Sequence, residues 1–431
     1  MCRVLVDSGI GYLGNIPREW NIFRIKNAFK CGKNIVNDNW SNTQLLSLTT
    51  SGVKEKDIDN PNGKLPDSFD GYQYVEKNNI IMCLFDLDCS AVFSGISKYN
   101  GMISPAYKVL ECKEMMNPDY AGYYFNYISF DRKYMHYSKN IRYTLNYDEF
   151  SSLPMLIPPL EEQRKIAEYL DKQCAKIDEI ISDNNREIEL LEEYKRRIIF
   201  EKTSLGTITK VKNIGYVNGR IGFKGYSNED IVDEDTPGRA LSIGGTNIMK
   251  SGTLSYNKRT YISEEKYLES PEIMLTGGEI LMTKVGAGCG ENSIYEFYEE
   301  RVTINPNVMI LHVNDNVNSK YINYCLLNDE VRSNIKIESM SGGAQPAINQ
   351  ELLKNLKIKL PSKSEQDNNT DFLDKQCSKL DSVVEYRKQI IEKLEEYKRS
   401  LIYECVTGKR EVYYGNSRKE FWRINWKIFS Y

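Results

Sequence analysis

Histidine is almost absent from this chain, and its cysteines are scattered. The 431 residues include two histidines, His136 and His312, and ten cysteines that form no Cys-x-x-Cys pair. A structural zinc site needs four such ligands at close spacings, and imidazole catalysis needs a histidine. The sequence therefore argues against a zinc module, leaves few candidates for histidine chemistry and predicts free thiols in a reducing compartment.

A strong net charge and a long apolar run are also lacking. The chain has 57 basic and 60 acidic residues, a net charge of -3, so nucleic-acid binding would need a local basic surface. No stretch approaches the roughly 18 apolar residues of a membrane span, and Asp7 interrupts the opening before a secretory apolar segment could form. We expect a globular cytoplasmic protein with no membrane partner and, from its length, two or three cores.

What is present is an internal repeat. The segment LDKQC occurs at 170–174 and again at 373–377, and LEEYKR occurs at 191–196 and again at 394–399, each time 203 residues later. Further upstream, after a small shift in register, IIMCLF is matched by ILMTKV and ISPAYKVL by INPNVMIL. We interpret each half as one globular domain followed by one helix. The predicted divisions are a first domain at 1–157, a first helix at 158–206, a second domain at 207–359, a second helix at 360–407 and a tail at 408–431.

The two segments that follow Pro158 and Pro361 have the periodicity of long helices, expected at about 161–204 and 364–407. Their apolar residues alternate between three- and four-residue spacings over four heptads, which is typical of helices that pair with each other. Two copies related by a pseudo-two-fold axis would run antiparallel and carry their domains to opposite ends. Two independent core helices are the alternative. The positions predicted to pair the helices are Leu170, Ile177, Asn184, Leu191 and Ile198 in the first and Leu373, Leu380, Arg387, Leu394 and Leu401 in the second.

Asn184 and Arg387 are polar, and each is the middle one of five pairing positions. In an antiparallel pair the middle positions face each other, so we expect both residues in one layer, where polar side chains set the register at some cost in stability. Each helix would be about 65 Å long at ~1.5 Å per residue. Such a spacer could hold two domains on patches of duplex DNA about one turn, ~34 Å, apart.

Local basic clusters with interleaved tyrosines supply candidates for DNA binding. The segment 202–228 contains several lysines and one arginine, no acidic residue and several glycines, which is typical of a backbone that approaches phosphates. A solvated hairpin is the alternative. The predicted DNA-binding residues are Lys210, Lys212, Arg220, Lys224, Tyr226 and Lys284 in the second half and Arg132, Lys133, Tyr137, Lys139 and Arg142 in the first.

Motifs for catalysis are weak. Asn117-Pro-Asp-Tyr120 has the outline of an adenine methyltransferase loop but lacks its second proline, and it aligns with the loop that begins at Asn314 in the other half. The glycines at 286–290 follow an apolar strand but have the spacing of neither nucleotide-binding fingerprint. Asp86 and Asp88 lack the partners of a nuclease metal site. We therefore expect no catalytic residue and no metal site.

Several motifs resemble those of the specificity (S) subunits of type I restriction-modification systems. They are Gly14-Asn-Ile-Pro17-Arg-Glu-Trp20 near the start, IPPLEEQRKIAEYLD at 157–171, LPSKSEQDNNTDFLD at 360–374 and the Ser-Gly-Gly-x-Gln stretch at 341–345. The second half lacks an equivalent of Gly-x-Ile-Pro-x-x-Trp, and the tail after Gly408 departs from the family pattern.

The resemblance implies two target recognition domains of α/β (α+β) fold, joined by two antiparallel coiled-coil helices. It implies that the chain does no chemistry and recognises a bipartite, asymmetric sequence in double-stranded DNA. It also implies that two methyltransferase (modification) subunits and the restriction nuclease-translocase subunits are partners, and that S-adenosylmethionine, ATP and Mg²⁺ bind those partners rather than this chain. A stand-alone methyltransferase or nuclease, and a coiled-coil adaptor that binds only proteins, are the alternative functions.

Overall fold

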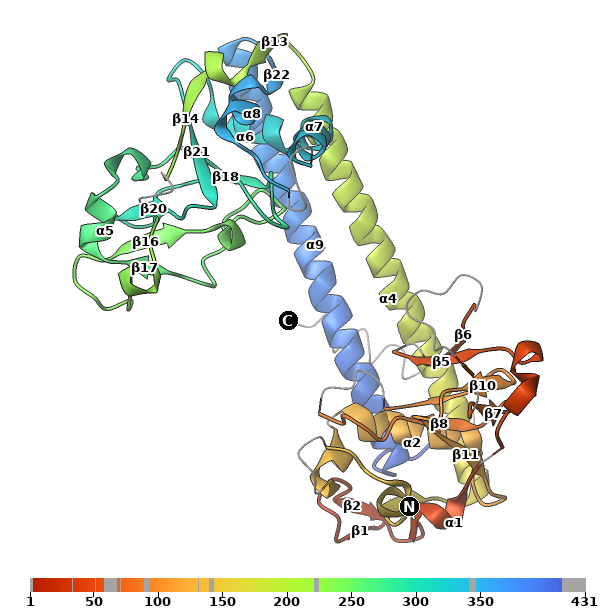
Figure 1. Cartoon of the computed structure of the whole chain (residues 1–431). Coiled ribbons are helices and arrows are strands. Elements are labelled where there is room, and N and C mark those ends of the chain that lie inside the picture. Colours follow the sequence, from red (N-terminus) through yellow and green to blue (C-terminus); the bar gives the residue numbers. More distant parts are fainter. Residues whose placement is uncertain are drawn as a thin grey trace. The chain divides into compact units, whose positions relative to one another are not determined.

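The computed structural model describes residues 3–32, 34–50, 52–57, 68–69, 71–88, 93–130, 132–138, 143–220, 225–340 and 346–412. It divides into two compact units (Figure 1). The first unit contains residues 1–184 and 388–431, and the second contains residues 185–387. Each unit therefore holds one globular part and a portion of each long helix.

The first unit is built from short strands and three short helices. Its strands are β1 (Leu5–Asp7), β2 (Asn15–Pro17), β3 (Asn21–Arg24), β4 (Phe29–Cys31), β5 (Leu46–Thr49), β6 (Gly52–Glu55), β7 (Gln73–Val75), β8 (Ile80–Met82), β9 (Ser94–Ile96), β10 (Gly101–Ile103), β11 (Lys108–Cys112) and β12 (Pro154–Ile157). Its helices are α1 (Ile25–Ala28), α2 (Pro118–Phe130) and α3 (Tyr147–Ser151), with 3-10 turns η1 (Asn37–Asn42) and η2 (Lys133–Tyr137).

A four-stranded antiparallel sheet in the order β4-β11-β8-β9 forms the centre of the first unit. Side chains alternate between the two faces of a strand, and the run Ile80-Ile81-Met82 in β8 is buried throughout, so both faces of the sheet must be covered. Ile80 and Met82 pack with α2, whereas Ile81 packs with the hairpin β5-β6 and with β7 and β10. The apolar run thus serves two hydrophobic clusters.

The second unit repeats this arrangement, and the strands of its central sheet are longer on average. Its strands are β13 (Thr207–Lys210), β14 (Gly215–Gly219), β15 (Ile231–Val232), β16 (Ala240–Ile243), β17 (Tyr261–Ile262), β18 (Ile280–Thr283), β19 (Asn292–Ile294), β20 (Val302–Ile304), β21 (Val308–Val313) and β22 (Lys357–Leu360). Its helices are α5 (Glu264–Leu268), α6 (Ser319–Leu327), α7 (Asp329–Ser339) and α8 (Gln350–Asn355), with 3-10 turns η3 (Val211–Asn213), η5 (Asn228–Asp230), η6 (Gly245–Asn247) and η7 (Pro271–Ile273).

The central sheet of the second unit has the order β14-β21-β18-β19, and a second sheet has the order β15-β17-β16-β20. Ile280 and Met282 of β18 pack with α6, and Leu281 packs with β16 and β20. The segments IIMCLF and ILMTKV, matched in the sequence, therefore contain the same strand of the same two-layered fold. The predicted mixed helix and strand domains are confirmed.

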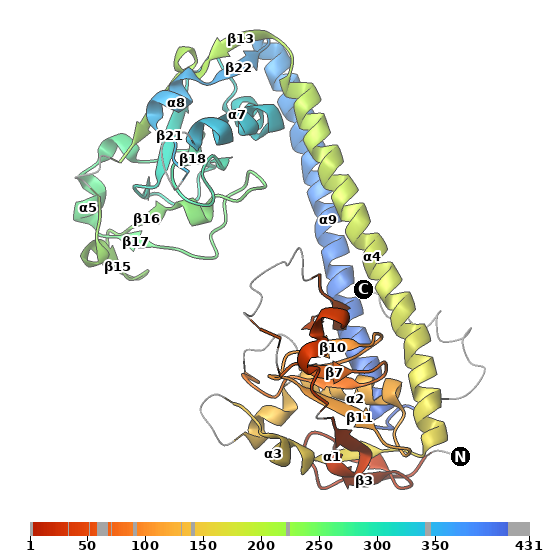
Figure 2. The same ribbon diagram turned by 45° about the vertical axis from the view of Figure 1, so that its right-hand side comes forward.

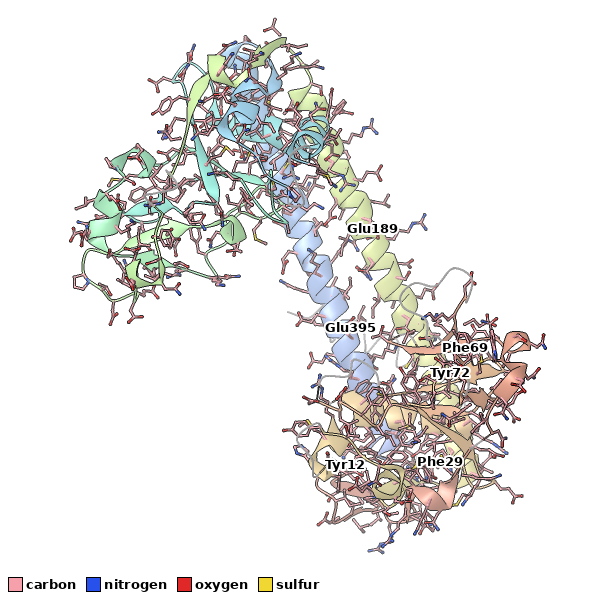
Figure 3. All side chains as sticks on the ribbon, viewed as in Figure 1. Tyr12, Phe29, Phe69, Tyr72, Glu189 and Glu395 are labelled. Atoms are coloured by element: carbon pink, nitrogen blue, oxygen red, sulfur yellow. The ribbon has the colours of Figure 1, made fainter. Side chains whose placement is uncertain are left out.

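The two long helices are α4 (Leu160–Thr203) and α9 (Lys363–Val406), of 44 residues each, within one residue of the predicted ends. Pro159 precedes α4, and acidic residues in its first turn suit the positive end of the helix dipole. Before α9, Ser362 and Glu365 exchange hydrogen bonds as a capping pair. Glu189 on α4 and Glu395 on α9 are exposed (Figure 3). No helix in the described part of the chain is long and apolar enough to cross a membrane.

Contacts within each unit give the direction of the helices. In the first unit, Arg410, just beyond the end of α9, donates a hydrogen bond to Tyr169 of α4. Nine residues further along α4, Asp178 accepts a hydrogen bond from Lys398 of α9. In the second unit, Lys195 of α4 donates a hydrogen bond to Asp381 of α9. Further along α4, the Lys202 ammonium lies 4.8 Å from the ring centre of Phe372 near the start of α9. Positions that rise along α4 fall along α9, so the predicted antiparallel pairing is confirmed.

Candidate nucleic-acid interface

Lys210 and Lys212 are positioned by the two-stranded sheet β13-β22, which lies where α4 ends and α9 begins (Figure 2). Lys210 ends β13, and its Nζ atom lies 3.3 Å from Oδ1 of Asn355. Lys212 follows in η3 and is exposed. An uncharged amide leaves the ammonium of Lys210 its full charge, so both side chains are chemically able to contact phosphates.

Arg220 does not fit the phosphate contact that the sequence suggests. It is 3% exposed, and its Nε donates to the backbone oxygen of Ile304 at 3.2 Å. Its guanidinium also lies 5.6 Å from the ring centre of Tyr226, whose hydroxyl is 2.9 Å from Oγ of Ser242. Burial disfavours the charged form and lowers the pKa of Arg220 from its usual value. Arg220 and Tyr226 therefore connect β14 to the second sheet, while Lys224 lies outside the described residues.

Lys284 follows β18 and is half-buried. Its Nζ donates to the backbone oxygen of Pro306 at 3.1 Å, and its backbone N–H donates to Asn307 at 2.7 Å. The glycine turn at 286–290 closes beside it, because the N–H of Gly290 returns to the oxygen of Thr283 at 3.0 Å. The glycines thus close a turn between β18 and β19, and Lys284 fixes that turn to the end of β20.

The first-unit candidates gather on η2. Arg132 precedes this turn in the left-handed conformation, with φ 50°, and is exposed. The ammonium of Lys133 lies 4.7 Å from the ring centre of Tyr127, and Tyr137 packs edge-on against Tyr12, which Figure 3 labels. Lys139 and Arg142 lie outside the described residues. Among the described candidates here, the exposed Arg132 side chain makes no hydrogen bond or ring contact, so it can reach a phosphate most freely.

The helix-pairing positions are buried to different degrees. Buried are Leu170, Ile177, Asn184, Ile198, Leu373, Leu394 and Leu401, and partly buried are Leu191, Leu380 and Arg387. The amide of Asn184 donates to the backbone oxygen of Ile180 at 2.8 Å, and Arg387 forms an ion pair with Glu187 of α4. The two compact units divide immediately after Asn184 and immediately after Arg387.

A buried glutamine attaches each globular part to its helix. Gln163 of α4 accepts from the N–H of Asn117 at 2.8 Å and donates to the oxygen of Pro158. Gln366 of α9 accepts from the N–H of Asn318 at 3.0 Å and donates to Pro361. The match of Gln163 with Gln366 across the repeat was visible in the sequence, but its role depends on contacts far along the chain.

Asn117 caps a helix, although its motif has the outline of a methyltransferase loop. Its side chain accepts from the N–H of Tyr120 at 2.9 Å and so caps the start of α2. Asn318 caps α6 in the same way through Tyr321 at 3.0 Å. The counterpart of Asn117 is therefore Asn318, and the alignment with the loop at Asn314 was wrong, because the shared contact to the helix glutamine defines the equivalence.

Thiols and acidic residues form no reactive cluster in the described residues. The cysteines of that part form no disulfide bond, and burial raises the pKa of Cys174 to about 11, which keeps this thiol protonated at neutral pH. Within the same residues, no group of three or more His, Cys, Asp or Glu side chains is arranged to hold a metal ion.

A sequence profile of the type I restriction modification DNA specificity domain matches residues 17–190 and again residues 222–396. The two matches together span most of the chain, one in each repeat. The chain belongs to this family. Each matched range contains most of one globular part and most of the long helix that follows it. The matched domain is one of DNA specificity and not of catalysis.

Two curated relatives come from Methanocaldococcus jannaschii. The "Type I restriction enzyme MjaVIII specificity subunit" is 21% identical over 286 residues, which are 61% of this chain and 63% of the relative. The "Putative type I restriction enzyme MjaX specificity subunit" is 24% identical over 285 residues, 62% of each chain. The matched part thus spans a little under two thirds of these relatives.

A solved chain shows the same fold. The structure described as "Structural basis underlying complex assembly and conformational transition of the type I R-M system" contains a chain with a TM-score of 0.68 and 13% identity to this one. The likeness covers 92% of this chain and 99% of that one. The shared fold therefore extends over nearly all of the sequence.

Proposed function

We propose that this chain is the subunit of a type I restriction-modification complex that recognises a bipartite, asymmetric DNA sequence and binds methyltransferase subunits. The observation that carries the proposal is the double match to the DNA specificity domain, one for each repeat. Two different recognition domains in one chain would recognise two different half-sites, which makes the whole target asymmetric.

The long helices support a fixed separation of the half-sites. Each is continuous over 44 residues, about 65 Å at ~1.5 Å per residue, and a paired helix resists bending more than a loop does. A rigid spacer between two recognition domains would fix the number of base pairs between the half-sites.

Basic side chains would supply affinity that does not depend on sequence. Lys212 and Arg132 are the described candidates that we assign to phosphates. Lys133, Tyr137, Tyr226 and Lys284 are more constrained by their contacts. Phosphate contacts position a protein on DNA, and contacts to base edges then give specificity. We assign no base contact.

Catalysis in this proposal belongs to other subunits. Methyltransferase subunits would bind S-adenosylmethionine, and nuclease-translocase subunits would bind ATP and Mg²⁺. In keeping with this proposal, we assign no catalytic role to any described residue of this chain.

Methylome sequencing tests the proposal. A host that carries the gene should show one methylated motif consisting of two half-sites and a gap, and deletion of the gene should remove that motif alone. Complementation with the unaltered gene is the control and should restore it. If deletion changes no motif while the modification gene is expressed, the proposed function is wrong.

A further inference from the structure

One face of the β13-β22 sheet combines lysines with an exposed isoleucine. In the antiparallel register, Lys210 is opposite Lys357 and Ile208 is opposite Lys359. Side chains two residues apart on a strand point to the same side, so these four share one face. Ile358 points to the other side and is buried in the hydrophobic cluster of the second unit. We call these four residues the lysine face; the exposed Leu205 lies just before β13.

The lysine face is exposed and has unbalanced charge. Ile208 is 69% exposed and Leu205 is 60% exposed. Within the described residues, Lys210, Lys357 and Lys359 form no ion pair with a carboxylate, and the partner of Lys210 is the neutral amide of Asn355. Like charges directly opposite each other on neighbouring strands are destabilising, so the pair Lys210 and Lys357 costs stability. The stability of the folded chain therefore gives no reason for placing these lysines side by side.

The equivalent face of the first unit is covered by the chain itself. There β3 and β12 pair in the same way, with Arg24 opposite Pro154 and Ile22 opposite Leu156. Leu156 is fully buried in the same cluster as Leu13, Ile16 and Trp20, and the hydroxyl of Tyr12 donates to Pro154 at 3.0 Å. Residues of the segment 12–20 therefore pack in the cluster that buries Leu156.

The second unit has no counterpart of that segment, because the chain passes from the end of α4 at Thr203 to the start of β13 at Thr207 within a few residues. Where the first unit has Trp20, the second has Gly206 in the same register, with φ 103° and no room for a side chain against the backbone of Leu360. Lys359 stands in the place of the buried Leu156. The second unit thus presents, uncovered in its described part, the face that the first unit covers.

We propose that the lysine face binds a segment of a partner protein that carries acidic and aliphatic side chains. The inference rests on the proposed function, because it assumes that partner subunits exist. Carboxylates of the partner would pair with Lys210, Lys357 and Lys359 and relieve their mutual repulsion, while its aliphatic side chains would cover Ile208 and Leu205. Opposite charges at the rim and apolar contact at the centre are the usual composition of a protein interface.

DNA fits this face less well than a protein does. Phosphate contacts use hydrogen-bond donors and positive charge, and a large aliphatic side chain adds nothing to them. Two such side chains, both more than half exposed, stand on this one small sheet and its approach. Removing them from water favours a partner with apolar groups of its own.

The test uses the full chain and the purified modification subunit from the same host. The variant Lys357→Glu/Lys359→Glu should bind that subunit at least tenfold more weakly than the wild type, and its binding should lose most of its dependence on salt. Ile208→Ala should weaken binding at all salt concentrations alike. The variant Lys250→Glu/Lys258→Glu makes the same change of charge at exposed positions of the same unit, and it should bind the subunit as the wild type does.

Other outcomes overturn the proposal. The proposal is wrong if Lys357→Glu/Lys359→Glu binds the modification subunit with wild-type affinity and unfolds at the wild-type temperature. A loss of DNA affinity with normal subunit binding would assign the face to DNA instead. Failure of the wild-type chain to bind the modification subunit would disprove the proposed function and, with it, this surface.

Discussion

Lys398 of α9 donates a hydrogen bond to Asp178 of α4 at 2.6 Å. At the matching positions of the repeat, Lys195 of α4 donates to Asp381 of α9 at 2.7 Å. Each helix therefore contributes one lysine and one aspartate, and the two halves of the sequence exchange roles. Both aspartates are about half exposed, so such pairs contribute at most about 1 kcal/mol each and specify the register more than they stabilise it.

Reversing both lysines should weaken the helix pairing. Lys195→Glu/Lys398→Glu places like charges at both positions, and we expect the free energy of unfolding to fall by about 1–2 kcal/mol at low salt. Urea denaturation measures the change. Adding Asp178→Lys/Asp381→Lys should restore most of the loss, and failure of this rescue would show that the pairs do not act across the helices.

Truncating a buried pairing residue should cost more. Leu373 is fully buried, and Leu373→Ala should reduce the free energy of unfolding by about 2–5 kcal/mol, because the lost contacts leave a cavity. Leu190→Ala is the matched control, since Leu190 is on the other helix of the same unit and is 56% exposed. It should change stability by no more than about 0.5 kcal/mol. Equal effects would contradict the assigned core.

Removing the buried glutamine should loosen the second unit. Gln366→Ala leaves the N–H of Asn318 and the oxygen of Pro361 without this partner, and each unsatisfied buried group costs about 1–3 kcal/mol. Amide hydrogen exchange should speed up at the start of α6. Gln163→Ala should do the same at the start of α2 in the first unit and leave α6 unchanged.

Lys212 and Arg220 should behave differently although both are basic. Lys212→Ala should weaken DNA binding for all sequences alike and reduce the slope of log affinity against log salt by about 1. Arg220→Ala should instead lower thermal stability, since it removes a buried donor to Ile304. DNA titrations at several salt concentrations, paired with thermal unfolding, separate the two. A normal melting temperature for Arg220→Ala would contradict its buried role.

Lengthening both helices should change the gap in the DNA target. One added heptad after Asn184 and one after Arg387 preserves the pairing pattern and adds about 10 Å at ~1.5 Å per residue. At ~3.4 Å per base pair, the gap in the methylated motif should grow by about three base pairs with unchanged half-sites. Methylome sequencing reads the result. An unchanged gap would mean that the helices do not set the spacing.

Sequence patterns predicted the long helices well because their information is local and repeated. The spacing of Leu170, Ile177 and Leu191 and its recurrence 203 residues later give helix type, length and mutual pairing. The pattern overestimates burial near the middle, where Leu191 and Leu380 are only partly covered. A heptad position predicts the face of the helix on which a residue lies, but it does not predict how closely the neighbouring helix approaches.

The candidate interface was harder to predict because exposure depends on contacts distant in the chain. Arg220 lies in a segment rich in glycine and tyrosine that looks solvent-facing, yet the oxygen of Ile304, 84 residues later, holds it inside. Lys357 and Lys359 were overlooked for the opposite reason. Their segment, 354–363, contains four lysines without interleaved tyrosines, and only the strand register shows that Lys357 is opposite Lys210.

The first unit is discontinuous in the chain, and this constrains its synthesis. Leu394, Leu401 and Cys405 of α9 belong to the same hydrophobic cluster as Leu13 and Trp20. A growing polypeptide presents those early residues to water until nearly four hundred more have left the ribosome. The first globular part therefore stays incompletely packed while the second is synthesised. During this interval the nascent protein is most exposed to aggregation and proteolysis.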